Sequence, residues 1–365
     1  MSTQLLLTDE QRLEIEHAVQ SGEALPADWY FSPEIFAIEK KAIFERTWQY
    51  VGPVAHVGAP GDFYTVAVSD VPVVIARGED GTLHGMVNVC RHRGCEVVAG
   101  RTGNRKSLQC RYHGWTYGLD GSLKAAPRSS SQQGFDKAKY GLFPVSVAAW
   151  GPFLFVNLEA FRTDLSDYVG VLPGIVSDAR VDVDQLVYRR QVEYDVAANW
   201  KVVVENYLEC YHCAINHPGL SGSIILDQFH VTTHDNVIAE WAVMRPEYQA
   251  QGENATDPSF NYLWPTLILN AFAGTHPSAF ARRIIPVSPD RTLVHYDLYF
   301  AEEISEQEAE QTFLFADEVF REDIPLVESV QRGLSSGRFR EQRLFLTEEN
   351  GPQHFQQLVY EALQA

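Results

Sequence analysis

Residues 90–121 read CRHRGCEVVAGRTGNRKSLQCRYHGWTYGLDG and repeat one pattern, a cysteine followed closely by a histidine. The first copy is Cys90-x-His92, and the second, Cys110-x-x-His113, is separated from it by seventeen residues. Short β-rich runs surround both copies, and Asp-Gly pairs, which are typical of hairpin turns, stand before and within this region. We therefore expect a small all-β domain over residues 46–160 that carries the two motifs on loops between strands.

The residue types of these two loops indicate a cofactor. A Rieske [2Fe-2S] cluster requires two thiolates and two imidazoles, because two histidines replace two of the cysteines on one iron. A structural zinc ion can use the same residue types. Zinc fingers, however, group their cysteines and histidines as separate pairs, whereas here each loop contributes one of each. The sequence therefore predicts a Rieske cluster bound by Cys90, His92, Cys110 and His113.

Helix signals lie on both sides of this β-rich region. Capping patterns begin at Thr8 and Ser32, so residues 1–45 are expected to form helices that pack on the C-terminal domain. After residue 160, apolar β-like runs alternate with helical ones, and a last long helix is expected to begin at Ser305. The predicted fold class is α+β, with residues 161–365 as the second large domain.

A second cluster of chemically active residues lies at 206–219, which reads NYLECYHCAINHPG. Glu209 and His212 are three residues apart and would share one face of a helix. Pro218 disfavours helical backbone at His217, so the helix should end there and let His217 turn back toward His212. Two converging imidazoles would be part of a 2-His-1-carboxylate site for Fe(II), which needs one acid more.

The same segment permits simpler interpretations. Cys210 and Cys213 form a Cys-x-x-Cys pair, but no second thiol pair lies nearby, and thiolates beside an oxygen-activating iron would be oxidised, so we expect packing residues. His212 and His217 could be core histidines that find ordinary hydrogen-bond partners. The Rieske motifs at 90–113 favour the metal site instead.

Composition excludes several classes of partner. The chain of 365 residues has a formal net charge of −19 and a pI of about 5.0, so neither nucleic acid nor an anionic membrane surface is expected to bind. No secretory signal and no apolar run long enough to cross a bilayer is seen, and a cytoplasmic location is expected. No Gly-x-Gly-x-x-Gly fingerprint is present, so NAD(P)H and flavin are expected on a separate reductase.

Several segments resemble the Rieske non-heme iron oxygenases, and the likeness extends through most of the chain. Besides residues 90–121, these are NWKVVVENYLECYHC, NHPG and EDIPLVESVQRGL, which look most like the branch acting on quaternary ammonium compounds, the carnitine and γ-butyrobetaine monooxygenases with the glycine betaine and stachydrine demethylases. The resemblance implies a helix-grip-like catalytic domain with an antiparallel sheet and flanking helices. It also implies a mononuclear iron in that domain and a reductase that carries flavin and a ferredoxin-type cluster.

The resemblance further assigns roles to single residues. It implies that His212, His217 and Asp323 bind the iron, with Glu322 and Asp317 as the alternatives to Asp323, and that Pro325 loosens the helix around that acid. It implies a homotrimer in which Glu209 bridges to His113 of a neighbouring subunit, because the two centres of one chain are too far apart for electron transfer.

The implied reaction uses O2 and reductase-supplied electrons to hydroxylate a C–H next to the nitrogen of a quaternary amine, after which C–N cleavage or N-demethylation follows. Aromatic faces bind such a cation well, and Tyr207, Phe229, Trp264 and Phe272 are the candidates. Two alternatives are an aromatic ring-hydroxylating oxygenase and an electron-transfer Rieske protein without oxygenase activity.

Overall fold

A computed structural model describes residues 7–160, 163–247, 257–339 and 342–364. The chain divides into two compact units, one of residues 44–166 and the other of residues 1–43 together with 167–365. The edge expected at 160/161 adjoins residues 161 and 162, which lie outside the described residues, and the division itself falls after Ser166.

The unit of residues 44–166 is built on antiparallel strands. A seven-stranded sheet has the order β1-β10-β9-β4-β3-β2-β5, and a three-stranded sheet has the order β6-β7-β8. The Asp-Gly pairs turn the chain between β3 and β4 and between β7 and β8, with Gly81 at φ 83° and Gly121 at φ 79°. The strands are β1 (Gln49–Pro53), β2 (Asp62–Val68), β3 (Val71–Arg77), β4 (Leu83–Val87), β5 (Thr102–Asn104), β6 (Leu108–Gln109), β7 (Thr116–Tyr117), β8 (Leu123–Ala125), β9 (Pro144–Trp150) and β10 (Phe153–Asn157).

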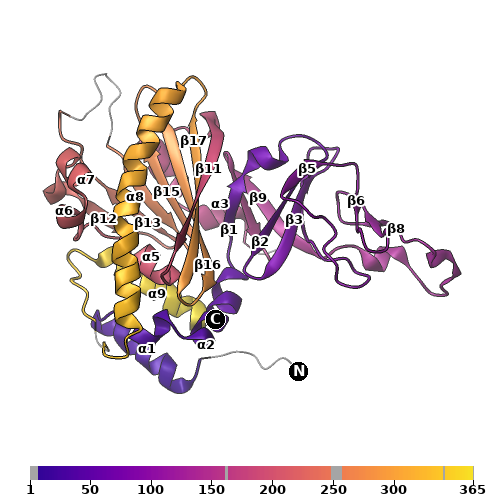
Figure 1. Ribbon diagram of the computed structural model, residues 1–365, viewed down its shortest axis with the longest axis horizontal. Helices are drawn as coiled ribbons and strands as arrows, with labels where there is room; N and C mark the ends of the chain where they lie inside the picture. The colour runs from indigo at the N-terminus through magenta and orange to yellow at the C-terminus, as the bar shows by residue number, and fades with distance from the viewer. Residues whose placement is uncertain (1–6, 161–162, 248–256, 340–341, 365) are drawn as a thin grey trace. The chain divides into compact units, whose positions relative to one another are not determined.

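The larger unit holds a second seven-stranded antiparallel sheet, with the order β11-β17-β16-β15-β14-β13-β12. The long helix α8 (Glu306–Leu334) lies across one face of this sheet (Figure 1), where Phe313 of the helix meets Tyr296 and Phe320 meets Tyr194. The strands are β11 (Leu186–Val196), β12 (His230–Thr233), β13 (Val237–Trp241), β14 (Ser259–Leu263), β15 (Leu267–Phe272), β16 (Ser278–Ser288) and β17 (Arg291–Ala301).

Further helices belong to this part of the chain. α8 begins at the Ser305–Glu308 capping box expected from the sequence, and α1 begins at the Thr8–Gln11 box. The buried Lys201 ammonium pairs with Glu39, which also accepts a hydrogen bond from Trp200, and these contacts tie α2 to α5. The remaining helices are α1 (Asp9–Ser21), α2 (Pro33–Glu39), α3 (Leu165–Val169), α4 (Leu172–Asp178), α5 (Trp200–Tyr207), α6 (Cys213–Asn216), α7 (Pro218–Ser223) and α9 (Asn350–Gln364).

None of the helices in the described part of the chain has both the length and the apolarity that crossing a bilayer requires.

Candidate metal centres

The two cysteine-histidine motifs fold into matching loops. In the first, the Cys90 amide donates to the Cys95 carbonyl at 2.8 Å and the Gly94 amide donates back to the Cys90 carbonyl at 3.0 Å. In the second, Cys110 donates to the Trp115 carbonyl and Gly114 to the Cys110 carbonyl at the same two distances. Both glycines adopt left-handed backbone, at φ 72° and 73°, which a side chain would disfavour. Each motif is thus a tight turn that holds its cysteine at the base.

The four donor side chains of these loops suit a cluster that is half buried and half exposed. Cys90 and Cys110 are buried free thiols, whereas His92 and His113 are exposed and their ring centroids lie 4.5 Å apart. His92 stacks on the Trp115 ring at 5.1 Å. The Tyr117 hydroxyl lies 3.3 Å from the Cys90 sulfur. Two sulfur and two nitrogen donors from paired loops fit a Rieske [2Fe-2S] cluster, with the sulfurs on its inner side.

In the larger unit, the segment after α5 does not form the helix expected from the sequence. α5 ends at Tyr207, so Glu209 and His212 lie in a turn before α6, and the expectation that they share a helical face was wrong. The physical reason is that the Glu209 carboxylate accepts hydrogen bonds from the Tyr211 and His212 amides, which replaces the helical pattern. His217 lies between α6 and α7, directly before Pro218, and its ring turns back to His212.

Three ligand atoms converge at this point. The Nε2 atoms of His212 and His217 are 3.0 Å apart, and the Asp323 Oδ1 atom lies 3.4 Å from the first and 3.0 Å from the second. Ligands about 2.1 Å from one metal ion at right angles stand about 3.0 Å from each other. Asp323 Oδ1 is also buried without a well-directed hydrogen bond. This triangle therefore fits a divalent metal ion bound on one face, as in a 2-His-1-carboxylate iron site.

Two further carboxylates stand behind the imidazoles. The Nδ1 atom of His212 contacts Glu209, and Nδ1 of His217 lies 2.8 Å from Glu322. Burial by itself would lower the pKa of His212, but the Asp323 and Glu209 carboxylates outweigh burial and raise that pKa to about 10. The carboxylates hold the Nδ1 protons, so a bound metal ion would replace only the proton on each Nε2 atom and take its lone pair.

The alternatives to Asp323 have other partners. Glu322 faces the outer nitrogen of His217, and Asp317 accepts hydrogen bonds from the Tyr194 hydroxyl and from Arg321 at 2.6 Å. Neither acid reaches the triangle. The sequence analysis did not predict that Glu322 contacts the Nδ1 atom of His217. The one feature of the sequence that could have indicated this contact is that Glu322 directly precedes Asp323.

Cys210 and Cys213 do not remain the free packing thiols expected from the sequence, because a disulfide joins them. The turn before α6 brings their Cα atoms to 4.9 Å, which lies within the range that a disulfide spans. The Cys213 sulfur lies near both imidazoles, but in the disulfide it offers no thiolate to a metal.

A pocket opens beside the triangle, between the sheet and the α5–α7 region. Tyr207 and Phe229 line it, together with Phe260, which sequence reasoning missed. Trp264 and Phe272 are not among its described lining residues, so their expected place there was wrong. Trp264 packs on the rings of Trp200 and Phe355, and Phe272 packs on Phe260 and Phe280.

The pocket also contains buried polar side chains that sequence reasoning did not single out. Glu240 is 4% exposed and its Oε1 atom has no hydrogen-bond partner, while Arg282 is 5% exposed. Burial, followed by the charge of Glu209, raises the pKa of Glu240 well above its ordinary range. The signal that could have found both residues is a charge inside an otherwise apolar strand, in NVIAEWAV and AFARRIIPV.

Residues 183–365 match the family described as ring hydroxylating alpha subunit (catalytic domain), and residues 47–140 match the Rieske [2Fe-2S] domain. The chain belongs to the family of ring-hydroxylating alpha subunits, the oxygenase components of Rieske non-heme iron systems.

Among its relatives, the carnitine monooxygenase oxygenase subunit of Acinetobacter baumannii is 34% identical over 92% of this chain and 93% of that protein. The chloroplastic choline monooxygenase of Arabidopsis thaliana is 31% identical over 90% of this chain and 80% of that protein. A solved quaternary ammonium Rieske monooxygenase in complex with L-carnitine is similar with a TM-score of 0.83 and 31% identity, covering 98% of this chain and 99% of that one.

These comparisons confirm the predicted family, the α+β fold with an all-β Rieske domain, and the two cofactors, a Rieske [2Fe-2S] cluster and a mononuclear iron. The zinc alternative for the first centre is therefore wrong.

Proposed function

We propose that this chain is the terminal oxygenase of a two-component system that hydroxylates a C–H next to the nitrogen of a quaternary ammonium compound. The overall change consumes O2, two electrons and two protons, inserts one oxygen atom into the C–H bond and releases the other as water. The carbinolamine product then breaks its C–N bond, giving an aldehyde and an amine. The observation that carries the proposal is the His212–His217–Asp323 triangle at the wall of a pocket lined by aromatic rings and a buried acid.

His212, His217 and Asp323 would hold the iron, and Cys90, His92, Cys110 and His113 the cluster. When bound, the iron supplies open positions for O2 and the cluster supplies single electrons. The chain's own residues prepare the site: Glu209 and Glu322 keep the Nδ1 protons and so orient both imidazoles. A quaternary ammonium group cannot donate a hydrogen bond, so the faces of Tyr207, Phe229 and Phe260 would bind it.

The electrons would come from a separate reductase that carries the nicotinamide, flavin and ferredoxin-type cofactors. We propose a cytoplasmic homotrimer in which Glu209 links His212 of one subunit to the partner's His113. The contact between Glu209 and His212 supports this role, because such a bridge would require Glu209 to reach His212 within its own subunit.

The test is a substrate panel with the reconstituted reductase, scored by O2 uptake and by release of trimethylamine or formaldehyde. We expect carnitine, γ-butyrobetaine or glycine betaine to drive uptake, and benzoate and naphthalene to be inactive. Uptake driven only by the aromatic compounds would replace this proposal with a ring hydroxylase. A protein with about two irons per chain and no turnover would instead be an electron carrier.

A further inference from the structure

Two ionisable side chains, one acidic and one basic, lie buried in the pocket beside the proposed iron ligands. Glu240 is 4% exposed and Arg282 is 5% exposed, and both border the same space as His212 and Asp323. A buried charge without an ionic partner is costly, so charged side chains in protein interiors are nearly always paired. Such a pair inside a substrate pocket needs an explanation.

The sheet register sets how far apart these charges stand. Glu240 on β13 pairs with Phe260 on β14, which pairs with Asn270 on β15, which pairs with Phe280 on β16. Arg282 lies two residues beyond Phe280, and therefore on the same face of the sheet. Three strand spacings separate β13 from β16, so the backbones that carry the two charges are about 14 Å apart across the sheet. Phe260 and Asn270 stand on the same face between Glu240 and Arg282, and all four side chains border the pocket.

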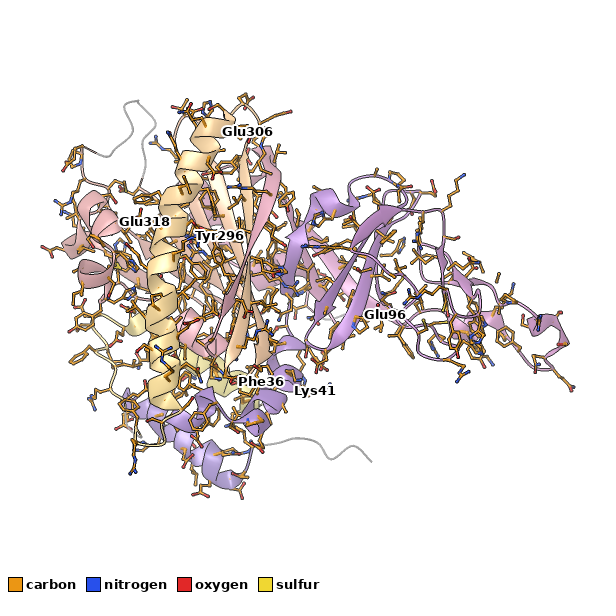
Figure 2. All side chains as sticks on the ribbon, viewed as in Figure 1. Phe36, Lys41, Glu96, Tyr296, Glu306 and Glu318 are labelled. Carbon is orange, nitrogen blue, oxygen red and sulfur yellow. A yellow bond between two sulfur atoms is a disulfide. The ribbon has the colours of Figure 1, made fainter. Side chains whose placement is uncertain are left out.

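Neither charge has a salt-bridge partner among the described residues. The Oε1 atom of Glu240 and the Nε atom of Arg282 both lack hydrogen-bond partners. The guanidinium donates to the Tyr296 hydroxyl at 3.2 Å and lies over the rings of Tyr296 at 4.6 Å and Phe320 at 4.8 Å. Tyr296, labelled in Figure 2, holds the Arg282 side chain from the neighbouring strand β17. Aromatic faces support a guanidinium without neutralising it.

We propose that Glu240 and Arg282 recognise the two ends of a zwitterion, with the substrate ammonium near Glu240 and a substrate carboxylate at Arg282. This inference rests on the proposed function and narrows it to betaines, which carry a carboxylate, and against cationic alcohols such as choline. The guanidinium presents a planar fork of donors that matches a carboxylate. The ammonium has no proton to donate, and its positive charge would favour the ionised form of Glu240, whose pKa burial raises in the empty pocket. Phe260 and Tyr207 supply ring faces.

The first experiment compares γ-butyrobetaine with its methyl ester, which has the same trimethylammonium group but no carboxylate charge. The wild-type enzyme with its reductase should prefer γ-butyrobetaine in kcat/KM by about 100-fold, since a buried charged partner is lost with the ester. Glycine betaine and choline make a second pair, with the same expected direction. Equal kcat/KM values for both members of each pair in the wild type would overturn the proposal, and no variant is needed for this result.

Variants of Arg282 and Glu240 then test which residue binds the carboxylate of the substrate and which binds its ammonium group. Arg282→Met should reduce the betaine-to-ester ratio to within about threefold of unity, and Arg282→Lys should retain at least about tenfold selectivity because it keeps the charge. Glu240→Gln should weaken binding of γ-butyrobetaine by about tenfold relative to the isostere in which a tert-butyl group replaces the ammonium, measured by titration calorimetry. The visible spectrum of the cluster and the iron content report that each variant is folded.

The outcomes separate this inference from the proposed function. If the wild type oxidises none of the quaternary amines although it holds its full iron, the proposed function fails. If it oxidises them and Arg282→Met leaves the betaine-to-ester ratio unchanged, only the assignment of Arg282 fails. A preference of the wild type for choline over glycine betaine would show that the pocket selects a cation without a carboxylate.

Discussion

The Nδ1 atom of His217 lies 2.8 Å from the Glu322 carboxylate, and the Nε2 atom of the same ring lies 3.0 Å from Asp323. Two consecutive acids of α8 thus contact opposite edges of one imidazole. One acid belongs to the ligand triangle, and the other fixes the ring that completes it.

Glu322→Gln should therefore weaken iron binding without removing a ligand. An amide can no longer accept from Nδ1 as strongly, so we expect a loss of about 10- to 100-fold in iron affinity. Mononuclear iron retained after dialysis against a chelator measures this loss. The matched control is Glu318→Gln, an exposed acid on the same helix (Figure 2), which should retain iron like the wild type.

Exchanging the candidate third ligands should distinguish them. Asp323→Asn should reduce the iron content from about three to about two atoms per chain and abolish turnover, while the cluster spectrum stays intact. Asp317→Asn should retain all the iron, because Asp317 bonds Tyr194 and Arg321 instead. His212→Ala should resemble Asp323→Asn. Loss of the cluster spectrum in His212→Ala would show that the two metal centres have been assigned to the wrong residues.

Tyr117→Phe should lower the reduction potential of the cluster. The Tyr117 hydroxyl lies 3.3 Å from the Cys90 sulfur, where a hydrogen bond stabilises the more negative, reduced state. Loss of about 1.4 kcal/mol corresponds to about 60 mV for a one-electron couple. Spectroelectrochemical titration measures the shift. Tyr112→Phe is the control, since its hydroxyl accepts from Arg93, and an equal shift in both variants would argue against the Tyr117 contact.

The buried carboxyl group of Glu205 should make the free energy of unfolding depend on pH. Burial raises the pKa of Glu205 from 4.5 to about 7, against the opposing effect of hydrogen bonds from Gln356 and Tyr30. The folded state therefore holds a proton that the unfolded state releases above pH 4.5, so this residue's contribution to stability decreases as the pH rises from 4.5 to about 7.

Glu205→Gln should remove this dependence, because an amide stays neutral and can keep both hydrogen bonds. We expect the Tm of the variant minus that of the wild type to increase by about 3 °C between pH 5 and pH 8. A difference that stays constant over this range would mean that Glu205 titrates normally.

The sequence predicted best what is encoded over a few consecutive residues. Each cluster loop depends on a cysteine and on a glycine four residues later, and the capping boxes at Thr8 and Ser305 need only a residue and its neighbour three positions on. Both the loop contacts and the helix caps join residues three or four positions apart, so they can be predicted from the spacing of residues in the sequence. Asp323, the proposed third iron ligand, was not predicted from local spacing, because its segment was found only through the family resemblance.

Tertiary structure decided which residues face the pocket. Trp264 and Phe272 are aromatic and close in sequence to the lining residues, yet they are not among the described residues that line the pocket. Phe260, Glu240 and Arg282 do line it. The disulfide of Cys210 and Cys213 likewise depends on where α5 ends.

The sequence by itself thus determined the two-centre chemistry, because cysteine and histidine at fixed spacings restrict the metals that can bind. Only the tertiary structure decided which ionisable side chains border the pocket together. Glu240 and Arg282 are brought to one face by the register of four strands, and register depends on pairings between residues far apart in the chain.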